Sequence, residues 1–410
     1  MADLDQSFFI FKGEAVSLSG NEISMELNDY QAEVRNTDRT ADRTLAYPLL
    51  GLFGEVGTLL SVVKKKQRDA ASYIGYAPHV IEELGDVLWY FATVADRASI
   101  QLSDIGHNVN RGLQDWSDTG DASLRFSDLQ EVATVIPLVP TKEFENTLLN
   151  LAGEVGTVLS DYQAGRLTNN QAALKGRLVA VLRVLVRASN EAGVTLGEAA
   201  VKNLNKTFDR WPEKFIYPTP FDEGEKPFEQ LPRSLVIDVF EREIGGKLYV
   251  FQQCNGVNIG DRLTDNALEP DDYRFHDVFH YAYAAVLSWS PVTRSLLRLK
   301  RKSNPKVDEV EDGARATLIE EGIATSIFGQ AKQLQFFDGL KRGDLSFDML
   351  KAIRQFVIGY EAERCPLWVW EDAILQGYDA FRFLRAHRRA RLTIDMGQRK
   401  LLIGDLPRDT

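Results

Sequence analysis

The spacing of apolar positions changes about halfway along the chain. Over the first 210 residues they recur three and four positions apart, as on one face of an α-helix. After residue 233 they alternate with polar positions, which predicts strands over 234–243 and 247–254 joined by a tight turn at Gly245-Gly246. A second small hairpin, turning at Gly397, is predicted over 391–403 and would complete a sheet with the first. Between the hairpins, the pattern predicts helices over 271–290, 291–302, 308–333, 346–362 and 366–387.

Two of the helices predicted in the first half carry carboxylates on faces that can meet. Glu55 lies among apolar residues at helical spacing, so its face is partly buried. On the next helix Glu83 and Asp86 stand three apart, and Glu82 and Asp86 four apart, so these side chains can share a face. Carboxylates that face one another across two helices suit Mg²⁺, which prefers oxygen ligands and phosphate-bearing partners. The alternative is a solvated helix edge, where such pairs are common.

The first helical unit returns later in the chain. The segment NLAGEVGTVLS at 150–160 repeats GLFGEVGTLLS at 51–61, and the segment 202–211 mirrors 106–116. Glu154 takes the place of Glu55 in this repeat. A repeat of this length indicates a duplicated structural unit.

The combined pattern resembles the MazG-like, all-α nucleoside triphosphate pyrophosphohydrolases. The resemblance implies that Glu55, Glu83 and Asp86 bind Mg²⁺, or Mn²⁺ in its place, with Glu82 either supporting these ligands from behind or substituting for one of them. It also implies that water attacks a nucleoside triphosphate to release a monophosphate and pyrophosphate. Thr58 stands where the family has a second glutamate, and a threonine cannot serve as a base. The matching residues within 29–116 are Asp29-Tyr30-Gln31, Arg39-Thr40-Ala41, Tyr47-Pro48, the segment GLFGEVG at 51–57, lysines 64–66 and the segment EELGDVLWY at 82–90.

The second copy differs from the first in the residues that matter for this chemistry. Arg177 and Ala180 stand opposite Glu83 and Asp86, so the metal-binding pair is lost, whereas the last helix, KNLNKTFDRWP, is the better match to the family's phosphate- and base-contacting segment. Because members of the family act as oligomers, the two copies could form an internal pseudo-dimer. The alternatives are a homo-oligomer and a second copy that is only scaffold. The resemblance implies substrate contacts from Lys64, Lys65, Asn108, Asn203, Asn205, Lys206 and Arg210.

Proline, glycine and charge divide the chain into five parts. We expect an N-terminal arm over 1–28, MazG-like units over 29–116 and 141–211, a linker over 212–233, and a C-terminal domain over 234–410 whose family the sequence does not reveal. The predicted fold is mostly α, with tandem four-helix units followed by an α+β domain that contains a small antiparallel sheet.

The C-terminal part holds a second set of residues with metal-binding chemistry. His276 and His280 stand four apart, so both can face the same way on a helix, and Glu320 or Glu321 could supply an acidic ligand. The residue after the first histidine is Asp277 rather than the glutamate of the H-E-x-x-H protease motif, so that signature is broken. The pair is therefore open to two interpretations: a transition-metal site, or two structural histidines bonded to neighbouring acids.

Composition limits the kinds of partner, cysteine chemistry and cellular location that we expect. The net charge of −11 argues against a general nucleic-acid-binding surface, since phosphate contacts depend on Lys and Arg. Two cysteines without short spacing predict neither a disulfide framework nor a cysteine zinc site. The acidic N-terminus is unlike a signal peptide, and no run approaches 18 apolar residues, so we expect a cytoplasmic protein without a membrane span.

Three functions fit these observations. The first is Mg²⁺-dependent hydrolysis of a nucleoside triphosphate to a monophosphate and pyrophosphate. The second is a nucleotide-binding sensor with little turnover, whose C-terminal domain is the effector; the loss of the glutamate at Thr58 favours it. The third is a metal-dependent hydrolase that uses the site at His276 and His280.

Overall fold

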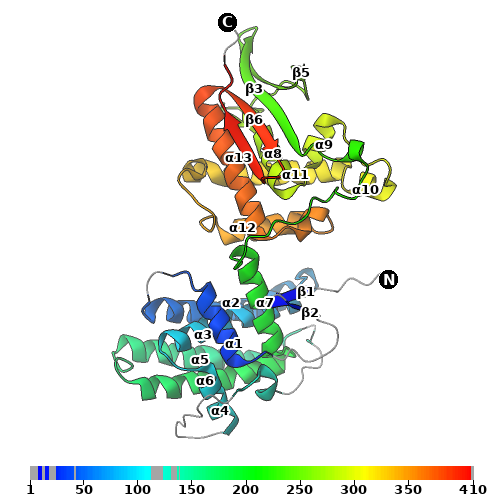
Figure 1. The fold of residues 1–410 in the computed structure, drawn as a ribbon. Coiled ribbons are helices and arrows are strands. Elements are labelled where there is room, and N and C mark those ends of the chain that lie inside the picture. Colours follow the sequence, from blue (N-terminus) through cyan, green and yellow to red (C-terminus); the bar gives the residue numbers. More distant parts are fainter. Residues whose placement is uncertain are drawn as a thin grey trace. The chain divides into compact units, whose positions relative to one another are not determined.

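The computed structural model describes residues 8–11, 14–17, 25–40, 43–111, 123–130, 136–137 and 139–407. The chain divides into two compact units, Met1–Phe208 and Asp209–Thr410, each with its own hydrophobic core. Figure 1 traces them from blue to green and from green to red. The prediction of a mostly helical chain with a small antiparallel sheet in its C-terminal part is confirmed.

The first unit is built from helices. They are α1 (Leu27–Thr37), α2 (Ala46–Asp69), α3 (Tyr76–Arg97), α4 (Leu102–Arg111), α5 (Lys142–Gln163), α6 (Gln171–Ala192) and α7 (Leu196–Arg210). Caps fix several of their ends: the Thr141 side chain accepts from the backbone N–H of Phe144 at the start of α5, and Gly193 ends α6 with φ +70°. Two short strands, β1 (Phe8–Phe11) and β2 (Glu14–Ser17), pair antiparallel within the expected N-terminal arm.

The long helices pack as two antiparallel pairs, α2 with α3 and α5 with α6. The shorter helices cross between the pairs. α4 packs against α6, and α7 approaches α3 closely enough that a Cβ on Gly85 would lie 2.6 Å from the Ala199 carbonyl oxygen. Helix α4, which follows the α2–α3 pair, therefore contacts the α5–α6 pair. Helix α7, which follows the α5–α6 pair, contacts α3. The residues Asp115 and Trp116, which were expected to close the first MazG-like unit, lie outside the described residues, as does half of the expected connector 117–140.

One helix raises the question of a membrane span. By length and composition alone, the segment Ala46–Ser72, which includes α2, could cross a membrane. The test is weak, because the core helix of a soluble protein also passes it, and 39% of its apolar window is buried inside the unit. The expectation of no membrane span stays a prediction.

The second unit contains a five-stranded antiparallel sheet in the order β5-β4-β3-β6-β7. Both predicted hairpins are present and share this sheet, because β6 pairs with β3 along its whole length. Gly245 and Gly246 form the first turn with φ of +61° and +77°, as their sequence predicts. In the second turn the residue with positive φ is Arg399. The strands are β3 (Ser234–Ile244), β4 (Lys247–Cys254), β5 (Val257–Asn258), β6 (Arg389–Asp395) and β7 (Lys400–Gly404).

The helices of the second unit are shorter than predicted, apart from the last. Ser288 and Arg298 adopt positive φ and end two of them early, and the helix predicted over 308–333 is broken before Gly313. Helices α8 and α13 pack together and against strands β6 and β7, which places α8 in the core beside the sheet (Figure 1). The helices are α8 (Asp277–Leu287), α9 (Pro291–Leu297), α10 (Pro305–Val310), α11 (Ala314–Ala331), α12 (Phe347–Phe356) and α13 (Leu367–His387).

The segment expected to be a linker is partly packed into the second unit. Within 212–233 the only regular structure is a 3₁₀ turn, Pro227–Glu229. Asp222 is fully buried, accepts from the backbone N–H of Leu231 at 2.7 Å and pairs with the guanidinium groups of Arg233 and Arg294. The end of the segment is therefore part of the second unit's core.

Candidate functional site

The helix pair α2 and α3 brings three carboxylates together. Glu55 projects from α2, and Glu83 and Asp86 from α3, and their ligand oxygens all lie within 4.8 Å of one another. All three are half-buried. We call this group the carboxylate cluster. The i, i+3 spacing of Glu83 and Asp86 aligns them on one helix face, and the apolar contacts of α2 with α3 hold Glu55 opposite.

Burial and mutual repulsion both disfavour charge in this cluster. Burial first, and then the charges of Asp86, Glu55 and Glu82, raise the pKa of Glu83 to about 7. Burial also raises the pKa of Asp86, although the ammonium of Lys206 opposes the shift. A group of carboxylates held in this way gains stability from any cation that reaches it.

A cation does reach it from α7. Lys206 donates from Nζ to Asp86 Oδ2 and, at 3.1 Å, to Glu82 Oε1. The Asn203 amide donates to Asp86 Oδ1 at 2.8 Å, while its own buried Oδ1 has no hydrogen-bond partner among the described residues. Gly85 permits this approach, because any larger residue would meet the α7 backbone. Two of the expected substrate-contacting residues, Asn203 and Lys206, thus lie directly against Asp86.

Glu82 occupies a different place from the other carboxylates. It pairs with Lys206 and lies outside the set of oxygens that could share one ion in the described part of the chain. The structure therefore places Glu82 beside the cluster, in contact with Lys206, and its role as a substitute ligand stays a prediction.

The Thr58 hydroxyl is engaged within its own helix in this structure. Its side chain is exposed, and its hydroxyl donates to the Gly54 carbonyl at 3.2 Å within its own helix. Thr157, at the equivalent place in α5, does the same toward Gly153 at 2.9 Å. This i−4 bond is the usual use of a threonine in a helix interior.

The other residues expected to contact substrate are dispersed. Lys64, Lys65 and Asn205 are exposed. Asn108 is buried and donates to the Asp104 carbonyl of its own helix at 2.8 Å. Arg210 lies in the second unit, where its guanidinium donates to the backbone carbonyls of Gly343 and Leu345 at 3.0 and 2.5 Å. Its burial is thus explained by contacts within that unit.

Sequence reasoning did not assign two tyrosines that border the cluster. Burial, a hydrogen bond with Tyr47, and the charges of Glu55 and Asp86 raise the pKa of Tyr90. Burial and Asp86 do the same for Tyr30, whose buried hydroxyl has no hydrogen-bond partner among the described residues. Both residues lie in segments that carry the family resemblance, which was the available signal. Neutral phenols beside carboxylates are suited to donating hydrogen bonds.

In the second unit, His276 and His280 come together at the start of α8. Their ring centroids lie 5.9 Å apart, and together with Asp277 they offer ligand atoms within 4.8 Å of one another. Glu321, on α11, places Oε2 at 3.7 Å from His276 Nε2 and 3.4 Å from His280 Nε2. Glu320 instead faces Nδ1 of His280, at 2.9 Å. In the sequence, Asp277 was noted only because it breaks a protease motif, yet it belongs to this group.

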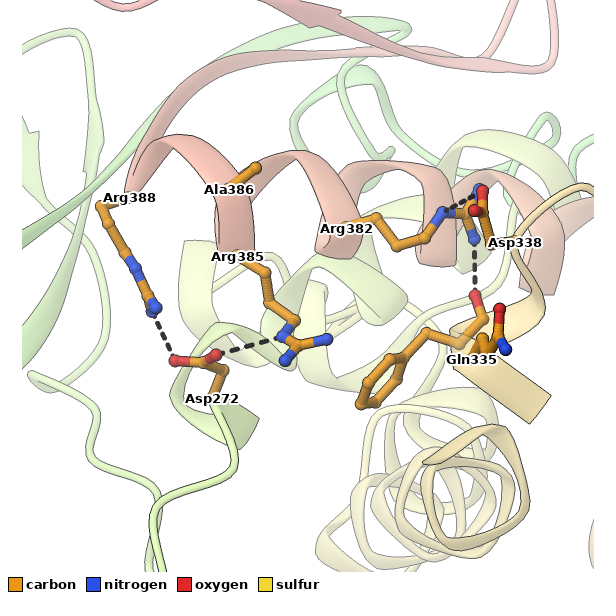
Figure 2. Close-up of a pocket in the computed structure, with 8 residues that line it drawn as sticks. Asp272, Gln335, Asp338, Arg382, Arg385, Ala386 and Arg388 are labelled. Carbon is orange, nitrogen blue, oxygen red and sulfur yellow. Dashed lines mark hydrogen bonds and ion pairs between the residues drawn. The ribbon is translucent and has the colours of Figure 1, made fainter. Parts of the chain in front are cut away.

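An open cavity of about 390 Å³ lies near the turn that precedes α8. Figure 2 shows Asp272 at its edge, between Arg385 and Arg388 of the α13 end, and it pairs with both. The third arginine of the cavity, Arg382, pairs with Asp379. Arg385 and Arg388 share the single carboxylate of Asp272 with Arg274, and these ion pairs anchor Asp272 and so the 3₁₀ turn, Tyr273–Phe275, that leads into His276.

Comparison with known proteins gives two matches. Residues 216–406 match the family model of the MazG C-terminal domain. The Gene 37 protein of Mycobacterium phage L5 is 36% identical over 78 residues, which is 18% of this chain and 68% of the phage protein. No solved structure matches.

Proposed function

Residues 216–406 match the MazG C-terminal domain, and from that premise we propose that the chain is a MazG-family protein whose first unit is a nucleoside triphosphate pyrophosphohydrolase. The reaction would release a nucleoside monophosphate and pyrophosphate and would depend on Mg²⁺. The observation that carries the proposal is the carboxylate cluster of Glu55, Glu83 and Asp86 with an ammonium group directly beside it.

The cluster fits a hard divalent cation. Its donors are carboxylate oxygens, and unit charges at such separations repel by about 3–4 kcal/mol at an effective dielectric constant near 20. Mg²⁺ bound there would screen the triphosphate and lower the pKa of a water molecule. Glu55, Glu83 and Asp86 would hold the ion, and a carboxylate oxygen left free of it would orient the attacking water.

Lys206 gives the cluster a contact for the substrate's remaining negative charge. It already lies between Glu82 and Asp86, so a small movement of its flexible side chain would let Nζ meet a phosphate oxygen. Asn203 holds Asp86 from the same helix and leaves its own carbonyl oxygen unpartnered. The phosphate-binding role that the resemblance implied for the last helix of the second copy is therefore assigned here to Lys206.

The proposal is tested by incubating the full chain with a panel of nucleoside triphosphates and Mg²⁺, and separating pyrophosphate from orthophosphate. Asp86→Asn should lower turnover at least tenfold, equivalent to about 1.4 kcal/mol in the barrier. Glu154→Gln, at the place in α5 that corresponds to Glu55, is the matched control and should leave turnover unchanged. Native turnover in folded Asp86→Asn protein would contradict the assignment.

A second function has one observation in its favour. Thr58 supplies no carboxylate, and its hydroxyl is held by its own helix. We therefore propose, as the alternative, a sensor that binds the nucleotide with little turnover and signals through its C-terminal domain. Tight binding of a triphosphate without either product in the same assay would select this alternative.

A further inference from the structure

The hydrolysis proposed for the first unit leaves the histidine group on α8 without a role. His276 shows why the group calls for a cation. Its Nδ1 lies 2.9 Å from the Tyr273 carbonyl oxygen, which can only accept, so Nδ1 carries the ring proton. In the neutral ring Nε2 then carries a lone pair and no proton, yet it faces Asp277 Oδ1 at 3.2 Å and Glu321 Oε2 at 3.7 Å. Electron pairs that face one another in this way need a positive charge between them.

His280 repeats the arrangement one helical turn later. Its Nδ1 faces Glu320 Oε1 at 2.9 Å, and that fully buried carboxylate also accepts from the Ser290 hydroxyl and the Val292 backbone N–H. A carboxylate that orients an imidazole through Nδ1 is the usual support of a metal-binding histidine. The opposite nitrogen, Nε2, is fully buried and has no hydrogen-bond partner among the described residues. Its nearest carboxylate oxygen is that of Glu321, at 3.4 Å.

The distances decide what kind of cation fits. Ligands about 2.0–2.1 Å from a tetrahedral metal ion stand about 3.3–3.4 Å from one another. Three of the six separations among the four side chains, 3.2, 3.4 and 3.7 Å, are close to that value. His276, Asp277 and His280 offer atoms that all lie within 4.8 Å of one another, and Glu321 is near both histidines but outside that set. We propose that the second unit binds a divalent first-row transition-metal ion of the zinc class through His276, His280, Asp277 and Glu321.

The surroundings hold the ligands in place and leave one side open. Tyr273 stacks on the His276 ring with centroids 4.4 Å apart, and the Gln252 amide donates to Asp277 Oδ2, which leaves Oδ1 toward the histidine. Glu321 is the exposed member, with 36% of its side chain accessible, so the ion can enter from that side. Imidazole nitrogens distinguish this site from the all-oxygen carboxylate cluster, and they favour transition metals over Mg²⁺.

The test is a Co²⁺ titration of the full chain, followed by visible absorption, with Zn²⁺ competition. Asp86→Asn serves as the parent protein, so that the carboxylate cluster competes less for the ion. We expect one equivalent of Co²⁺ per chain with absorption bands typical of nitrogen and oxygen ligands, displacement by Zn²⁺, and a rise in Tm. His276→Gln and Glu321→Gln should each weaken binding at least tenfold.

His387→Gln is the matched control, because it removes an exposed histidine that bonds only to its own helix at Phe383. It should titrate like the parent. If His276→Gln does not fold, Glu321→Gln decides the matter, since its partly exposed side chain can be replaced with little strain. A parent protein that takes up no Co²⁺, or variants that bind it as the parent does, would overturn the proposal and identify the pair as doubly protonated structural histidines.

Discussion

Glu83 couples its own protonation to the folding of the first unit. Burial and the neighbouring carboxylates raise its pKa from 4.5 to about 7. The native state therefore binds more protons than the unfolded state between these values, and the free energy of unfolding falls as pH rises through that window. At neutral pH burial and the neighbouring carboxylates both oppose the charged side chain, so a cation bound at the cluster would favour its ionised form.

The first prediction follows from this coupling. In chelator, Glu83→Gln should unfold at higher urea concentration than the native chain at pH 8, and the difference should shrink toward pH 4.5. We expect about 1–2 kcal/mol at pH 8, discounted for the partial exposure of the side chain. Glu154→Gln, outside the cluster, should show no such trend. An equal gain in the free energy of unfolding at both pH values would mean that repulsion between the ionised Glu83 and its neighbouring carboxylates is not the cause.

Thr58 allows a second prediction at this scale. If turnover is limited by a missing ligand, Thr58→Glu should tighten Mg²⁺ binding and raise the rate of pyrophosphate release, because an added carboxylate enlarges the cluster. Thr157→Glu makes the same change on α5 and should alter neither quantity. Weaker Mg²⁺ binding together with slower release in Thr58→Glu would show that the site depends on the threonine.

Among the elements, the contact of α3 with α7 is the most demanding. A Cβ at Gly85 would lie 2.6 Å from the Ala199 carbonyl oxygen and 3.0 Å from Asn203 Cβ. The end of a flexible side chain can move out of such a contact, but a helix backbone cannot. A side chain at position 85 would therefore push α3 and α7 apart. The same glycine therefore sets both the packing of α7 and the reach of Lys206.

We predict that Gly85→Ala lowers stability by about 1–3 kcal/mol and lowers turnover further than the loss of folded protein explains. Gly176→Ala is the matched change on α6, where an added Cβ has no neighbour within 4 Å, and it should raise stability by about 0.5–1 kcal/mol. Urea unfolding and pyrophosphate release measure the two effects. A Gly85→Ala protein as stable and active as the native chain would contradict the close approach.

The sequence was sufficient for elements that local chemistry decides. The turn of the first hairpin can be predicted from its two glycines alone. The position of Glu83 and Asp86 on one helix face follows from their spacing of three residues. The sequence was not sufficient where a contact with a residue distant in the chain determines the local structure. The helix predicted over 308–333 breaks because buried Asp312 turns to the backbone N–H and guanidinium of Arg301, and the pattern of apolar residues contains no sign of that pair. The contact of Lys206 with Asp86 spans 120 residues, and only the family resemblance suggested it.

At the scale of the whole molecule, the two hydrophobic cores have no residue in common. Within the second unit the segment before β3 matters energetically, because it supplies Asp222, a partner of Arg294. Both side chains are buried. Arg233 also pairs with Asp222 and Asp312 lies near Arg294, but removing either residue of the pair would take the main partner from the other buried charge.

We therefore predict that a fragment of residues 209–410 folds alone, whereas a fragment of residues 234–410 is less stable by about 3–5 kcal/mol or does not fold. Circular dichroism and urea unfolding of the two fragments test this. The Asp222→Ala variant of the longer fragment provides the comparison, since it loses the same partner without a change in length. Equal stability of both fragments would place the segment outside the second unit.

The meeting of Lys206 with Asp86 has a consequence for how the protein responds to dilution. In an assembly of separate subunits, a cation and a carboxylate from different chains part as the protein concentration falls. Here one polypeptide supplies both, so their encounter is intramolecular and their effective concentration is set by the fold. The ion pair should persist in a lone chain at nanomolar concentration, and each chain carries one such pairing whatever larger assembly it joins.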